Sequence, residues 1–131
     1  MKGEQTILCK KRNNNMYTIL PLATSPRQVF TLDMEIDGEP FHALVELRYL
    51  WAPDCWVLSI SDNASGELLV NRIPLICSLG RPNDLLRPFR HLREGRGLGS
   101  LLVIRAADEP ATPDPAENTL SSFTILWGDT L

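Results

Sequence analysis

Two alternating runs of apolar side chains, on either side of one dipeptide, constrain the fold of this chain most strongly. A period of two is expected of a half-buried β-strand, whereas a helix would scatter the same residues around its surface. The dipeptide Asp37-Gly38 accepts the positive φ angles of a tight hairpin turn. Pairing the runs across it places both apolar faces on one side, so turn and pattern predict the same register. The predicted buried residues are Phe30, Leu32, Met34 and Ile36 in the first run and Phe41, Ala43, Val45, Leu47 and Tyr49 in the second.

Further short strands are predicted by the same alternation and by the turn residues between the runs. We expect an edge or entry strand at residues 17–22, because Pro21 cannot donate a hydrogen bond to a sheet. The other predicted strands are residues 55–61, 67–73, 101–106 and 122–127. About six or seven short strands favour a mainly β fold, either a single antiparallel β-sandwich or a small barrel.

Two segments of the predicted fold are irregular. In residues 79–99, Pro82 and Pro88 limit any helix to about one turn, so we expect one short helical turn with a loop. Residues 108–118 hold three prolines among small and acidic residues, which is typical of a mobile surface loop.

Length and composition fit one globular domain. A chain of 131 residues with 44% hydrophobic residues can build one core, but not two of comfortable size. Residues 10–15 are basic and rich in Asn, and Met16 could itself be a start, so we predict a flexible N-terminal extension at 1–15 and a β domain at 16–131. No stretch approaches the roughly 18 apolar residues of a membrane span, and the first residues are too polar for a secretory signal. A soluble protein made in a cytoplasm is expected.

The net charge of −3 argues mildly against a general nucleic-acid binder, which would present a basic face. Cys9, Cys55 and Cys77 are odd in number and show no CxxC spacing, so free thiols in a reducing compartment are favoured over a disulfide framework or a zinc site.

No catalytic, cofactor or metal motif is recognisable. His42 and His91 are the only histidines, lie in no HExxH spacing and are interpreted as surface residues, and no GxSxG elbow presents a serine. Residues 95–100 resemble a phosphate-binding loop superficially, but they lack its spacing and precede a predicted strand. The favoured interpretation is a glycine-rich turn, in which Gly97 and Gly99 permit backbone angles or a close approach that a side chain would forbid.

Arginines in the irregular segment are the polar feature with a plausible role. Arginine binds carboxylates in a planar, bidentate manner and is common in interfaces, so this group could dock an acidic protein surface. Internal ion pairs of a solvated loop are an equal alternative, and nucleic acid is a weaker third because few aromatic residues lie nearby. Of the tryptophans, Trp56 and Trp127 are expected in the core, whereas Trp51 beside a Pro-Asp turn is the freer candidate for a contact surface. The predicted interface residues are Arg81, Arg87, Arg90, Arg93, Arg96 and Trp51.

Several short phrases, taken in order, carry a resemblance to one family. They are Tyr17-Thr18-Ile19 with Pro21-Leu22, Asn71-Arg72-Ile73-Pro74-Leu75, Asp84-Leu85-Leu86, Leu98-Gly99-Ser100-Leu101 and Phe123 to Trp127-Gly128-Asp129. From about Met16 to Thr130, the chain resembles the phage baseplate plug family, small proteins of contractile-tail phages and related prophages. The extension at 1–15 and the apparent insertion at 93–96 depart from the pattern.

The resemblance implies a non-enzymatic virion protein of the tail baseplate, present in the host cytoplasm during assembly. It implies partners among the hub, wedge and tail tube proteins, with no cofactor, nucleic acid or membrane, and it supplies no catalytic residues. The rival hypothesis is a small carbohydrate-binding or receptor-binding β module that uses Trp51 and nearby polar groups.

Overall fold

The hairpin around Asp37-Gly38 forms with the predicted register. Strand β3 (Arg27–Ile36) pairs antiparallel with β4 (Glu39–Leu50). The φ angles of Asp37 and Gly38 are 53° and 84°, as the two central residues of a type I′ turn require. Both predicted faces point into one core, in which Leu32, Ile36, Phe41, Ala43, Val45 and Leu47 are buried and Phe30, Met34 and Tyr49 are partly buried.

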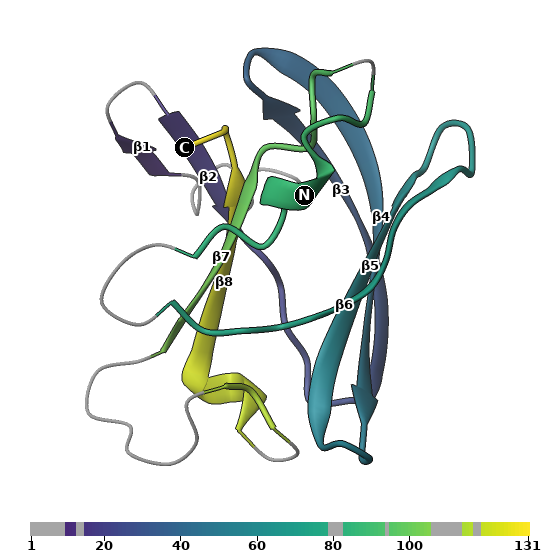
Figure 1. Ribbon diagram of the computed structural model, residues 1–131, viewed down its shortest axis with the longest axis vertical. Coiled ribbons are helices and arrows are strands. Elements are labelled where there is room, and N and C mark those ends of the chain that lie inside the picture. The colour runs from purple at the N-terminus through teal and green to yellow at the C-terminus, as the bar shows by residue number, and fades with distance from the viewer. Residues whose placement is uncertain (1–9, 13–14, 79–82, 94, 106–113, 117–118) are drawn as a thin grey trace.

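A computed structural model describes residues 10–12, 15–78, 83–93, 95–105, 114–116 and 119–131, with side chains from Tyr17 onward. In these residues the chain forms two four-stranded antiparallel sheets that face each other as a sandwich (Figure 1). Sheet A has the order β1-β2-β8-β7, and sheet B has the order β3-β4-β5-β6. The remaining strands are β1 (Lys10–Arg12), β2 (Asn15–Ile19), β5 (Cys55–Asp62), β6 (Leu68–Pro74), β7 (Ser100–Arg105) and β8 (Phe123–Gly128). The predicted mainly β fold is therefore confirmed, and of the two predicted architectures the structure has the sandwich.

Two details differ from the sequence prediction. The strand expected at 17–22 is not an edge strand of sheet A, because β2 ends at Ile19, before Pro21, and lies between β1 and β8. β1 itself falls within the range 1–15 assigned to a flexible extension, most of which lies outside the described residues. Besides the expected short turn of 3-10 helix, η1 (Arg87–Phe89), a second one, η2 (Leu120–Ser122), precedes β8.

The chain between β6 and η1 crosses from one sheet to the other. The backbone N–H of Leu75 still donates to the carbonyl of Trp56 in sheet B, at 2.9 Å. Two residues further on, Cys77 forms a parallel bridge with Val103 of β7, and Ser78 N donates to the Val103 carbonyl at 2.8 Å. This crossing, visible between β6 and the β7 edge in Figure 1, ties the two sheets together.

Trp127 of β8 packs across the contact between the two sheets. Its side chain is fully buried, and its ring meets that of Phe41 edge-on, with centroids 6.0 Å apart. The indole N–H of Trp127 donates to the Leu98 carbonyl at 2.7 Å, so its one polar group is satisfied. The predicted core positions of Trp56 and Trp127 are both confirmed.

Candidate functional site: a polar network and the surfaces around it

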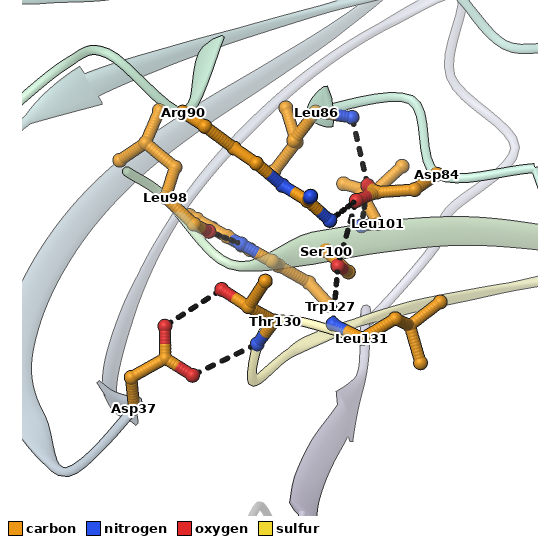
Figure 2. A network of polar contacts seen from close by, with 10 residues as sticks. All are labelled: Asp37, Asp84, Leu86, Arg90, Leu98, Ser100, Leu101, Trp127, Thr130 and Leu131. Carbon is orange, nitrogen blue, oxygen red and sulfur yellow. Dashed lines mark hydrogen bonds and ion pairs between the residues drawn. The ribbon is translucent and has the colours of Figure 1, made fainter. Parts of the chain in front are cut away.

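The carboxylate of Asp84 is the centre of a polar network that joins several segments of the chain. Its side chain is only 7% exposed. Oδ1 accepts hydrogen bonds from the backbone N–H groups of Leu86 at 3.0 Å and Leu101 at 3.1 Å. Oδ2 accepts from Ser100 Oγ at 2.7 Å and from Arg90 Nη2 at 3.1 Å (Figure 2). One acidic side chain thus joins the turn before η1 to the start of β7.

The network extends to the C-terminal residue through Ser100, which is fully buried. Ser100 Oγ donates to Asp84 and accepts a hydrogen bond from Leu131 N at 3.0 Å. At the hairpin tip of sheet B, the Asp37 carboxylate bonds to Thr130, as Figure 2 also shows. Residues 37, 84, 100 and 130, far apart in the sequence, therefore meet at one end of the sandwich.

Gly99 permits this convergence because no side chain fits at its position. Its φ is +79°, and a Cβ atom there would lie 1.9 Å from the Gly128 carbonyl oxygen and 2.9 Å from Ile36 Cγ2. At Gly97, φ is +71° and a Cβ would lie 3.2 Å from the Cα atom of Arg90. The interpretation of residues 95–100 as a glycine-rich turn is confirmed, and the turn leads into β7 rather than a helix.

The hydrogen bonds of this network join protein groups from separate segments of the chain. Ser100 has no exposed surface, and its hydroxyl bonds the Asp84 carboxylate and Leu131 N. Among the described residues no three His, Cys, Asp or Glu side chains are grouped as a metal would need. His42 and His91 are both exposed, and His42 Nδ1 lies 2.7 Å from the Asp33 carboxylate on the outer face of sheet B.

Two of the predicted interface arginines are committed to contacts inside the molecule. Arg90 binds Asp84, and its buried Nε has no hydrogen-bond partner among the described residues. The Arg93 guanidinium lies over the Phe41 ring, 4.7 Å from its centroid, and donates to the Gly97 carbonyl at 3.2 Å. Both side chains thereby hold residues 90–93 and 95–97 against the sandwich.

The other predicted interface residues differ in how accessible they are. Arg96 is exposed and lies 3.8 Å from the Glu39 carboxylate, while its Nε donates to the Arg93 carbonyl. Arg87 is exposed at the start of η1 and makes no side-chain hydrogen bond or ion pair with the described residues. Arg81, like most of the predicted loop at 108–118, lies outside the described residues.

Trp51 is the most accessible large apolar side chain described. It sits at the turn between β4 and β5 and is 82% exposed. The Tyr49 hydroxyl, near the end of β4, donates to the carboxylate of Asp54 in this turn. A shallow pocket near this turn is lined partly by Pro53, Asp54 and Cys55.

The outer faces of the two sheets differ in chemistry. The sheet A register places Ile19, Leu126 and Leu102 in one row across β2, β8 and β7. Ile104 continues this face and is 40% exposed. The outer face of sheet B carries charged and polar side chains instead, including Arg27, Thr31, Asp33, Glu35, His42 and Arg48.

Sequence reasoning missed the hub role of Asp84 and the role of Gln28. Gln28 is 7% exposed on the apolar face of β3, where its amide bonds three backbone groups of Ala23 and Ser25. A polar residue within an alternating apolar face was the available signal for Gln28. For Asp84, the signal was an acidic residue just before a predicted helical turn, where Asp commonly accepts a hydrogen bond from the backbone N–H two positions later, as it does here from Leu86.

The sequence matches no model of a known protein family, and no curated protein matches it. Among the described residues no helix has both the length and the apolar character needed to cross a lipid bilayer.

Proposed function

We propose that this protein is a non-enzymatic structural component of a contractile phage or prophage tail baseplate, where it joins the central hub and tube to surrounding wedge proteins. Its place would be the virion, after assembly in the host cytoplasm. The proposal starts from the resemblance of its short phrases to the baseplate plug family.

One observation carries the proposal: residues from three of those phrases are joined by hydrogen bonds at one end of the sandwich. Asp84, Ser100 and Trp127 each come from a different phrase, and their side chains bind one another or the backbone of a neighbouring phrase. Side chains with such internal hydrogen bonds stabilise the fold, a role that involves no substrate. This pattern supports a scaffold whose characteristic residues maintain shape, as a plug without catalytic residues would require.

The accessible candidates for contact with neighbouring proteins are Trp51 and Arg87. An exposed indole offers a large rigid surface, and an arginine with no side-chain partner among the described residues can bind a carboxylate of another chain at little cost in lost contacts. Arg96 is a weaker candidate because it already lies near Glu39. Arg90 and Arg93 are withdrawn from this role in our proposal, since their side chains hold the fold.

Sedimentation of particles tests the proposal. A lysate from cells that carry the whole gene cluster is fractionated on a gradient, and this protein is followed by mass spectrometry. We expect co-sedimentation with baseplates in a fixed ratio to tube and hub proteins. Baseplates that form without the protein, while it stays at the top of the gradient, would refute the structural role.

Variants define the contact surface in the same assay. Trp51→Ala and Arg87→Ala are expected to lower incorporation without changing the thermal unfolding midpoint of the isolated protein. Arg48→Ala, on the polar outer face of sheet B, is the matched control and should be incorporated normally.

A carbohydrate-binding module is the second candidate, because Trp51 is exposed in the same turn as Asp54, a carboxylate that could bind sugar hydroxyls. Sugar rings stack on exposed aromatic faces through their apolar C–H groups. A glycan array probed with the intact protein and with Trp51→Ala separates the two candidates. Binding lost in the variant would favour the glycan function, and absence of binding together with incorporation into baseplates would favour the structural one.

A further inference from the structure

β3 is a long edge strand whose outer side is open. It pairs with β4 along one side, and no other strand of sheet B adjoins it among the described residues. The Tyr49 N–H donates to the Pro26 carbonyl at 2.8 Å, which fixes the direction of the backbone groups. Because these groups alternate along a strand, even-numbered residues of β3 bond to β4 and odd-numbered residues point to the open edge.

At both ends of this edge, side chains form hydrogen bonds with the edge-facing backbone groups. In the middle of the edge, no described residue does so. At one end the Ser25 hydroxyl donates to the Arg27 carbonyl at 2.8 Å and accepts from Arg27 N at 3.3 Å. At the other end Asp37 N donates to the Asp129 carboxylate at 2.7 Å. Between them, the edge-facing backbone groups of residues 29, 31, 33 and 35 make no hydrogen bond to the described residues.

The remaining sheet edges are shorter, irregular or occupied. β6 carries irregular pairing with β5, has Arg72 at a φ of 53° and ends at Pro74. The outer side of β7 receives the bridge from Cys77, and β1 has only three residues. Bulges, proline, short length and charged side chains are the usual devices that prevent a sheet edge from pairing with another chain. β3 has no bulge, proline or short length, since its ten residues pair with β4 without a register shift. Its charged residues are Arg27, Asp33 and Glu35, so a second strand that adds here must pair them.

We propose that the open edge of β3 pairs with the same edge of a second copy of this chain, as a two-fold symmetric dimer. Along this edge the outer side chains run from Arg27 through Val29 and Thr31 to Asp33 and Glu35. Antiparallel pairing about a two-fold axis at Thr31 sets Arg27 opposite Glu35 of the second copy, twice. It also sets Asp33 opposite Val29 of the second copy, so no acidic pair is formed.

Charge disfavours a register centred on Asp33. An axis at Asp33 would oppose the two Asp33 side chains directly, and like charges opposite each other destabilise a sheet pair. Asp33 is 80% exposed and the Arg27 side chain 67% exposed, so both are accessible to a second chain. Arg27 already binds Glu46 of its own sheet at 2.8 Å, and a second carboxylate across the axis would share the same guanidinium.

The inner face of the strand gains from the same pairing. Phe30 and Met34 are only partly buried although their side chains face the core, because they lie at the margin of sheet B. A second β3 would place Leu32 of the second copy beside Phe30 and extend sheet B continuously through the axis. The dimer does not depend on the proposed baseplate role.

Sedimentation velocity of the full chain over a range of concentrations tests the dimer. Thr31→Pro removes the N–H at the axis but no bond to β4, because proline is tolerated where the N–H faces an open edge. We expect the wild-type protein to dimerise and the dissociation constant to rise roughly tenfold or more in Thr31→Pro. Thr31→Val, which keeps the N–H, should dimerise like the wild type. Far-UV circular dichroism and urea unfolding verify that each variant is folded.

Charge reversal tests the register independently. Glu35→Lys is expected to weaken the dimer, since it faces Arg27 of the second copy, and Arg27→Glu is expected to weaken it likewise. The double variant Arg27→Glu/Glu35→Lys should regain most of the wild-type affinity. Wild-type protein that stays monomeric up to about 1 mM, or a dimer equally stable in Thr31→Pro, would overturn the proposal.

Discussion

The carboxylate of Asp37 binds Thr130 twice across 93 positions of the sequence. Oδ1 accepts from Thr130 N at 2.9 Å, and Oδ2 accepts from Thr130 Oγ1 at 2.7 Å. Asp37 is also the first residue of the β3–β4 turn, where its φ of 53° suits an Asp. The same residue thus shapes the hairpin of sheet B and fastens it to the end of sheet A.

Thr130→Val should lower the free energy of unfolding by about 1 kcal/mol, because it removes one of these hydrogen bonds while keeping the side-chain shape. Thr124→Val is the matched control on the exposed face of β8 and should change stability by less than about 0.5 kcal/mol. Urea unfolding measures both.

A double-mutant cycle with Asp37→Gly isolates the pair, since glycine keeps the turn conformation and removes the carboxylate. We expect a coupling energy of about 0.5–1.5 kcal/mol between positions 37 and 130. A coupling near zero would mean that the two residues act independently on stability.

Local sequence patterns were sufficient to predict the hairpin, but not the hydrogen bonds that join the two sheets. Alternation and the Asp37-Gly38 turn predict which residues of β3 and β4 are buried, because both signals lie within a few positions of each other. The bonds from Asp37 to Thr130 and from Asp84 to Leu101 join segments that no period relates. Such contacts depend on how the two sheets stack, which a single sequence does not encode locally.

The candidate interface residues were also only partly predictable from the sequence. Trp51 beside a Pro-Asp turn could be identified as exposed from its neighbours in sequence, and it is 82% exposed. The arginines could not be sorted, because the same residue type serves as an internal fastener at Arg90 and as an exposed charge at Arg87. What distinguishes them is the buried carboxylate of Asp84, three positions before Arg87 and six before Arg90.

Asp84→Asn should lower the free energy of unfolding by about 2 kcal/mol. The amide would retain one acceptor for the backbone donors, but its NH₂ group would replace the oxygen that receives Ser100 and Arg90. Asp33→Asn, at an exposed carboxylate bonded to His42, is the control and should cost less than about 0.5 kcal/mol. Equal effects of the two changes in urea unfolding would contradict the hub role of Asp84.

Gly99→Ala should be far more damaging than Gly66→Ala, although both glycines have a φ near +80°. At Gly66 no atom lies within 4 Å of the added Cβ, so the cost is the left-handed backbone alone, about 1–2 kcal/mol. At Gly99 the Cβ meets a backbone carbonyl oxygen, which cannot move without separating β7 from β8. We expect a loss above about 3 kcal/mol, or little soluble protein. Similar unfolding midpoints would show that the 97–100 turn is free to shift.

Two variants with the same change in charge, Arg90→Ala and Arg87→Ala, distinguish an arginine that stabilises the fold from one that is available to contact other proteins. Removal of Arg90 leaves the largely buried Asp84 carboxylate with one donor fewer, so we expect a loss of about 1–2 kcal/mol in the free energy of unfolding. Arg87→Ala removes an exposed side chain and should stay within about 0.5 kcal/mol of the wild type. Arg90→Met, which keeps much of the packed stem, isolates the charged contact from the loss of packing. A destabilised Arg87→Ala beside an unaffected Arg90→Ala in urea unfolding would reverse the two assignments, and Arg90 would then return as a candidate for contact with other proteins.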